Sequence, residues 1–120
     1  MVNAHQEADR YLIKCKENYF KKIRPANSIS RSLSDYQTLV DIAKIYFKKD
    51  QQRDFSQFFM EGQYLIDLWT AHLILEYGQP DNDLKKESLE IIKSYSKTPL
   101  DESLANEEKV FLESYIRNSK

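Results

Sequence analysis

The stretch LIDLWTAHLILEYGQP (residues 65–80) decides the expected fold of this 120-residue chain. Its apolar residues fall on nearly every side of a helix, and such a helix is usually covered by neighbours on several sides. We therefore predict a central buried helix with Trp69 in the core. Its end is marked by Gly78 as a left-handed cap and by Pro80 two residues later.

The residues before this stretch continue its apolar face. Phe55, Phe58 and Phe59 keep the helical spacing, so the sequence predicts one central rod over 50–77, or two helices if Gly62 interrupts it. A glycine costs a helix about 1 kcal/mol relative to alanine. Its missing side chain would also let a neighbouring helix come close, and both alternatives stay open.

Four further segments show helical periodicity, over about 3–24, 34–49, 81–96 and 98–116. Ser34 and Gln37 stand at capping-box spacing, and Thr98 followed by Pro99 is typical of a helix start, although the last helix could begin a few residues later. Short connections favour antiparallel neighbours. The expected fold class is all-α: one domain over 1–120, a bundle of about five antiparallel helices around a central apolar one.

Composition excludes several other classes. Two glycines and three prolines are too few for a β-sandwich or barrel, and 41% hydrophobic residues are enough to bury a core. No run approaches the about 18 apolar residues of a membrane span, and the N-terminal residues lack an apolar signal region. The single cysteine, Cys15, fits a reducing compartment. We expect a cytoplasmic protein with no membrane partner.

The residues that could support catalysis are few. His5 falls in the first turn of the chain, and His72 lies one helical turn from Glu76, where a carboxylate can satisfy a buried imidazole. Cys15 falls on an apolar stripe, which is typical of an inert core thiol. A structural zinc needs four Cys or His ligands, and the chain has three such residues, widely separated. We predict no enzyme activity, no metal site and no cofactor.

Charge is distributed unevenly along the chain. Residues 1–49 carry ten Lys and Arg against five Asp and Glu, whereas residues 50–83 carry one basic residue, Arg53, against seven acids. An acidic surface of this kind attracts a basic partner. The candidate partner-binding residues are the acids on or beside the central helix: Glu61, Asp67, Glu76, Asp81 and Asp83. Asp81 and Asp83 also suit the N-terminus of the helix that follows.

Two alternatives remain. Basic residues fall on about one face of the first helix and could follow a nucleic-acid backbone: Arg10, Lys14, Lys21 and Arg24. The sequence pI of about 6.1 argues against that alternative. The other alternative is a subunit of a helical homo-oligomer that uses surplus aromatic residues such as Phe55, Phe59 or Tyr64 at a self-interface.

The central helix also carries a resemblance. Trp69, a small residue and Ala71, followed by an apolar run that closes the helix, are similar to the inner helix of HEAT-like repeats. In particular, residues 55–116 resemble the small helical immunity proteins that bacteria carry against polymorphic or contact-dependent toxins. The resemblance implies a stoichiometric inhibitor without catalysis, whose acidic residues cover the basic active site of a cognate toxin, in many cases a nuclease. The chain has no second copy of the motif, and its first helix does not match a repeat.

Overall fold

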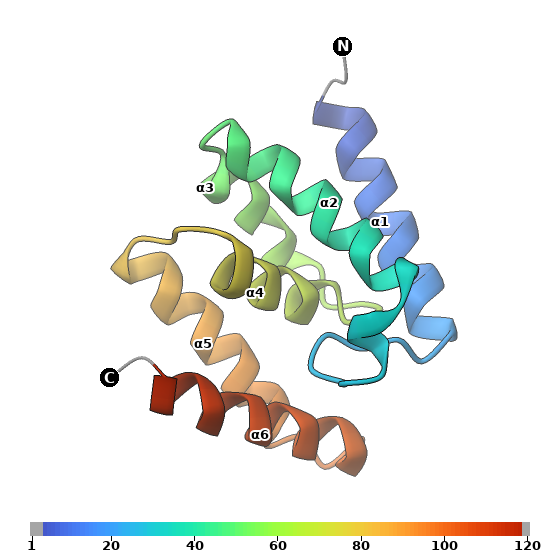
Figure 1. The fold of residues 1–120 in the computed structure, drawn as a ribbon, viewed down its shortest axis with the longest axis vertical. Coiled ribbons are helices and arrows are strands. Elements are labelled where there is room, and N and C mark those ends of the chain that lie inside the picture. The colour runs from blue at the N-terminus through green and yellow to red at the C-terminus, as the bar shows by residue number, and fades with distance from the viewer. Residues whose placement is uncertain (1–3, 119–120) are drawn as a thin grey trace.

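Helices are the only regular elements in the part of the chain that the computed structural model describes, residues 4–118. In order these are α1 (Ala4–Phe20), the 3₁₀ helix η1 (Ser30–Ser32), α2 (Ser34–Lys48), α3 (Gln52–Phe55), the 3₁₀ helix η2 (Ser56–Met60), α4 (Ile66–Tyr77), α5 (Asn82–Ser96) and α6 (Glu102–Asn118). They form one compact domain (Figure 1). The all-α class is confirmed. The described α-helices number six rather than five, and the antiparallel arrangement stays a prediction.

Helix α4 lies in the middle of the domain, between the α1–α2 pair and the α5–α6 pair (Figure 1). Every residue from Ile66 to Leu75 except Asp67 is buried. One side of α4 joins a core cluster with α1 and α2 through Trp69 and Leu73. The other side joins a second cluster with α5 and α6 through Leu68 and Ala71. The prediction of a central apolar helix is confirmed, because each of its sides meets a different layer.

Of the two alternatives for 50–77, the single rod is wrong, and the interruption at Gly62 is present. Helix α3 passes directly into η2, and residues 61–65 then form a non-helical connection before α4 begins. Tyr64 and Leu65 adopt left-handed backbone conformations with φ of 56° and 58°, which no continuous α-helix contains. Gly62 is exposed, and a Cβ placed on it would meet nothing within 4 Å. The expectation that this glycine admits a neighbouring helix is therefore also wrong.

Gly78 ends α4 in a different way from the one predicted. Its φ of −96° and ψ of −172° are extended rather than left-handed. A Cβ at this position would lie 2.8 Å from the carbonyl oxygen of Ile74 and 2.5 Å from Gln52 Oε1. Gly78 is thus required for close approach: Gln52 crosses the end of α4, accepts from the Gln79 backbone N–H at 2.5 Å and donates to the Gln79 carbonyl at 3.1 Å.

The helices begin close to the residues predicted from the sequence, but not all of the predicted capping hydrogen bonds form. Helix α2 begins at Ser34 as expected, but neither Leu33 before it nor Ser34 makes a capping hydrogen bond, so the capping box is wrong. Helix α6 begins at Glu102, a few residues after Thr98. Asp101 caps it by accepting from the Leu104 backbone N–H at 3.0 Å. Asp81 caps α5 in the same way, accepting from Leu84 N–H at 2.8 Å.

Helix α1 ends at Phe20, earlier than the expected Arg24, in a Schellman motif. The Ile23 N–H donates to the Asn18 carbonyl at 2.9 Å, and the Lys22 N–H donates to the Tyr19 carbonyl at 3.1 Å. Lys22 has a φ of 61° and occupies the position where glycine is usual. Because the motif contains no glycine, the sequence does not predict that the helix ends here.

Replacing Lys22 by glycine is expected to stabilise the protein. A non-glycine residue in the left-handed region carries a steric penalty that glycine does not, so Lys22→Gly should raise the free energy of unfolding by about 0.5–1 kcal/mol. Urea denaturation followed by circular dichroism measures this change. Lys22→Ala is the matched control, because it removes the same charge but keeps the Cβ. An equal gain from Lys22→Ala would show that the lysine side chain, and not the backbone, is responsible.

Candidate functional site

A groove of about 890 Å³ lies between the loop after α1, the C-terminal half of α4 and the outer face of α6; we call it the α4–α6 groove. Arg31 and Asn27 come from the loop, Glu76 from α4, and Phe111 from α6. Apolar walls with a few convergent polar groups are typical of binding sites. The remaining lining residues are Ala26, Ser28, Leu75, Ser103, Asn106, Glu107, Val110, Ser114, Tyr115 and Asn118.

A network of basic and acidic side chains runs from the lining of this groove, Arg31 and Glu76, to the buried residues His72 and Glu108. His72 Nε2 is 2.5 Å from Glu108 Oε1, and His72 Nδ1 is 3.3 Å from Glu76 Oε2. Glu76 in turn accepts hydrogen bonds from the Arg31 guanidinium. Because each ring nitrogen faces a carboxylate oxygen, the imidazolium form, which donates from both nitrogens, satisfies both partners. The network therefore pairs two carboxyl side chains, Glu108 and Glu76, with two basic ones, His72 and Arg31.

Burial and ion pairing have opposite effects on the pKa values of His72 and Glu76. Burial favours neutral His72, but hydrogen bonds and charges from Glu108 and Glu76 outweigh it and hold the pKa of His72 above its usual value. Burial also raises the pKa of the Glu76 carboxyl, but His72 and Arg31 outweigh it and hold that pKa below its usual value. Both shifts favour the charged forms.

The geometry of His72 suits a structural role. Its side chain is 1% exposed, Phe111 packs against the ring at a centroid distance of 4.3 Å, and carboxylates occupy both nitrogens. A general base needs a free nitrogen within reach of the substrate proton. Glu108 is fully buried, and its second oxygen, Oε2, has no hydrogen-bond partner among the described residues. The expected His72–Glu76 pair is present, and Glu108 and Arg31 extend it.

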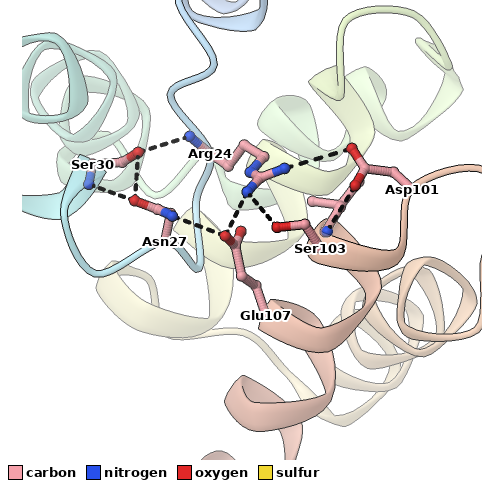
Figure 2. Close-up of polar contacts among 7 residues, drawn as sticks. Arg24, Asn27, Ser30, Asp101, Ser103 and Glu107 are labelled. Atoms are coloured by element: carbon pink, nitrogen blue, oxygen red, sulfur yellow. Dashed lines mark hydrogen bonds and ion pairs between the residues drawn. The ribbon is translucent and has the colours of Figure 1, made fainter.

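A second polar network ties the same loop to the start of α6 (Figure 2). Arg24 donates to Glu107 at 2.6 Å and to Ser103 at 3.2 Å, and it forms an ion pair with Asp101 at 3.5 Å. Asn27 also donates to Glu107, at 2.8 Å. Figure 2 shows the Arg24 side chain reaching from the loop to the first turns of α6. The loop over 21–33 is therefore anchored at two points: its Arg24 binds residues of α6, and its Arg31 binds Glu76 of α4.

The five predicted acidic residues do not form one patch. Glu61 and Asp67 lie at the N-terminal end of α4, and the other three lie at or after its C-terminal end. Asp67 is partly buried and accepts from the Tyr95 hydroxyl at 2.7 Å. Burial raises its pKa, against the hydrogen bonds from Tyr95 and the Leu68 N–H. Glu76 is paired with Arg31 and His72. Asp67 and Glu76 are thus engaged within the protein, which weakens the partner-binding role predicted for them.

Asp81 and Asp83 remain exposed at the start of α5. Arg53 of α3 crosses to them: it lies 2.7 Å from Glu87 and 3.8 Å from Asp81, and the charge of Asp83 also acts on it. Asp54, next to Arg53, is exposed as well. Three carboxylates act on Arg53: Asp81, Asp83 and Glu87. Together with the exposed Asp54 of α3 they make up the surface that we call the acidic end.

The four basic residues of the alternative nucleic-acid face form ion pairs with carboxylates of the same chain. Arg10 pairs with Glu7 at 2.9 Å, and Arg24 with Glu107. Lys14 and Lys21 both lie near Asp35, at 2.5 and 3.5 Å, and these cations lower the pKa of that carboxyl. The first helix therefore presents less free positive charge than its sequence indicates.

The other residues singled out from the sequence also have definite places. Cys15 is fully buried, and burial raises the pKa of its thiol. Phe55, expected at a self-interface, is instead a core residue at 0% exposure, whereas Phe59 and Tyr64 are partly buried. His5 lies outside the residues whose side chains are described.

Sequence reasoning missed Glu108 and Arg31 as partners of the central helix. Nothing in the sequence marks these two charged residues, because they lie far from Glu76 and His72 along the chain and reach them only through tertiary contact. Among the side chains that the structure describes, no group of three or more His, Cys, Asp or Glu is placed to hold a metal ion. None of the helices in residues 4–118 is both long and apolar enough to cross a bilayer. Comparisons with protein-family models, curated proteins and solved structures find no match for this chain.

Proposed function

We propose that this chain is a non-catalytic protein-binding domain that inhibits a basic protein partner, as a bacterial immunity protein neutralises its cognate toxin in the cytoplasm. The observation that carries the proposal is the acidic end, where the exposed carboxylates Asp81, Asp83 and Glu87 share the one arginine that reaches them, Arg53, and Asp54 adds a fourth exposed carboxylate on α3. A cluster of like charge on a rigid surface speeds encounter with a partner of opposite charge. A toxin that cleaves nucleic acid has such a positive surface, because it must bind phosphate.

The scaffold supports this role in two ways. Asp81 caps α5 and Asp83 lies in its first turn, where the helix dipole favours negative charge. Among the described residues, Asp54 and Asp83 form no ion pair with the chain itself. Their charge is therefore available to a partner.

The alternatives receive less support. Internal pairs engage Arg10, Lys14, Lys21 and Arg24, which weakens the proposal of a nucleic-acid interface on α1. The homo-oligomer alternative loses Phe55, which lies in the core.

Charge reversal at the acidic end is expected to slow binding. The double variant Asp54→Lys/Asp83→Lys leaves the Asp81 cap in place and should lower the association rate with the cognate basic toxin by about tenfold or more at low salt, with a smaller effect at high salt. Surface plasmon resonance against a toxin inactivated at its catalytic site measures the rate. The candidate toxin is a basic protein whose gene lies next to the gene for this chain.

Asp9→Lys/Glu113→Lys is the matched control, because both residues are exposed and the net charge changes equally. It should reduce the rate much less. Equal slowing by both variants would mean that overall charge matters rather than the acidic end. An unchanged rate in Asp54→Lys/Asp83→Lys would overturn the proposed surface.

A further inference from the structure

A second groove, of about 760 Å³, lies where the C-terminal end of α1 meets the α5–α6 connection; we call it the α1–α6 groove. Its walls are mostly aromatic and aliphatic: Tyr19, Phe20, Leu65, Tyr95, Leu100 and Leu104. Neither the network of His72 nor the acidic end belongs to it. The acidic end is at the start of α5, and this groove is at the other end of that helix (Figure 1).

Large apolar side chains stand exposed around the α1–α6 groove. Phe20 is 67% exposed and Leu100 is 92% exposed. Tyr19, Phe20 and Tyr64 hold one another in ring contacts, with centroid distances of 5.4, 5.5 and 5.8 Å. Interfaces are enriched in aromatic residues at their cores, and rings already packed together lose little freedom on binding. The groove has the composition of a protein-binding surface.

Unusual backbone conformations gather at the same place. Within residues 4–118, four non-glycine residues have positive φ, and Lys22, Tyr64 and Leu65 are three of them. Lys22 and Leu65 line the groove, and Tyr64 contacts its aromatic wall. Strained residues of this kind persist where the surroundings hold them, and they concentrate at functional sites.

Among the residues that line this groove, the charge left without an ion pair is positive. Its one lining carboxylate, Asp101, is paired with Arg24. Lys22, on the lining, and Lys16, 5.5 Å from the Tyr64 ring centroid, lie within ion-pair distance of no carboxylate of the described residues. A partner that fills the apolar walls and complements these two lysines carries acidic side chains beside an apolar one.

We propose that the α1–α6 groove binds an acidic peptide segment of a partner protein, with an aromatic or aliphatic side chain seated against Leu65 and Tyr95. Lys16 and Lys22 pair with carboxylates that flank this side chain. The inference concerns a different surface from the acidic end and adds a second binding activity to the protein. Aliphatic walls favour a peptide over a nucleic acid, whose bases need flat stacking partners along a basic path.

Selection from a library of short random peptides displayed on phage tests the proposal, with the wild-type chain immobilised. Enriched sequences should combine acidic residues with one or two large apolar residues. A synthetic selected peptide, labelled for fluorescence anisotropy, should bind Phe20→Ser/Leu100→Ser at least about tenfold more weakly than wild type. Binding to Lys16→Glu/Lys22→Glu should weaken similarly and depend less on salt.

Two controls make the result specific. Ile29→Ser/Val110→Ser removes two other exposed apolar residues, which lie outside this groove, and should leave peptide binding unchanged. Asp54→Lys/Asp83→Lys should also leave it unchanged, so that failure here and failure of the proposed toxin inhibition are distinguishable. Circular dichroism checks that each variant is folded.

Three results would overturn the proposal. The first is a selection that enriches peptides lacking acidic residues, or one that enriches the same peptides on immobilised Phe20→Ser/Leu100→Ser as on the wild type. The second is tighter binding of a labelled oligothymidine than of the selected peptide, which would assign the groove to nucleic acid. The third is concentration-dependent dimerisation in sedimentation that Phe20→Ser/Leu100→Ser abolishes, which would assign it to a second copy of this chain.

Discussion

Trp69→Ala is expected to lower the free energy of unfolding by about 3–5 kcal/mol, the range found for removal of a large buried ring. Trp69 is fully buried, belongs to the core cluster that α4 shares with α1 and α2, and contacts the Tyr36 ring at a centroid distance of 5.6 Å. A small domain often has only about 5–15 kcal/mol of stability in total. Thermal and urea denaturation followed by circular dichroism measure the loss.

Trp69→Phe is the matched control for this cavity. The indole Nε1 has no hydrogen-bond partner among the described residues, so phenylalanine removes an unsatisfied donor and fills much of the same space. We expect Trp69→Phe to lose less than half as much stability as Trp69→Ala. A melting temperature for Trp69→Ala within about 5 °C of the wild type, which corresponds to roughly 1 kcal/mol, would contradict the core placement.

His72→Gln is expected to cost about 3–5 kcal/mol near pH 6, because it leaves the buried Glu108 without its cationic partner. The sign of the pH dependence follows from the raised pKa of His72. The stabilisation is fully present below the unfolded pKa of about 6.5 and is lost as the pH rises through the higher folded pKa. The stability difference between wild type and His72→Gln should therefore shrink on the alkaline side. Urea denaturation over a pH series measures it.

A double-mutant cycle separates the charge from the packing. Glu108→Gln combined with His72→Gln removes both charges while two amides of similar size remain. Removing both partners of a buried pair costs less than removing one, so the double variant should be more stable than His72→Gln alone. Two outcomes would show that the imidazolium between Glu108 and Glu76 does not stabilise the fold. One is that the stability losses of His72→Gln and Glu108→Gln add up to the loss of the double variant. The other is that His72→Gln loses stability with rising pH as the wild type does.

Two features of this protein follow from the sequence alone. Apolar residues on all sides of 66–75 require burial on several sides, so α4 had to be central, and the structure places it there. Cys15 and His72 were expected in apolar surroundings, the histidine with a carboxylate, and both are buried. These inferences succeed because periodicity and burial are local properties that each segment carries by itself.

Where helices stop was decided by contacts that periodicity does not contain. Residues 61–65 leave the helical path although their neighbours keep the spacing, and Phe55 and Phe58 instead pack with Tyr11 at 4.9 and 4.7 Å. Lys22 stands in a left-handed cap without the glycine that would announce it. Such conformations persist because the packing around them outweighs a local cost of about 1–3 kcal/mol.

Charge pairing belongs to tertiary structure for the same reason. The sequence determined that this chain is helical, with an apolar helix at its centre and an acidic middle third. Only the folded chain decided that Glu76 meets Arg31, that Arg24 meets Glu107, and that Asp81 and Asp83 stay exposed. Coulomb energy depends on the distance between groups, and residues that are 45 or 83 positions apart acquire a distance only when the helices pack.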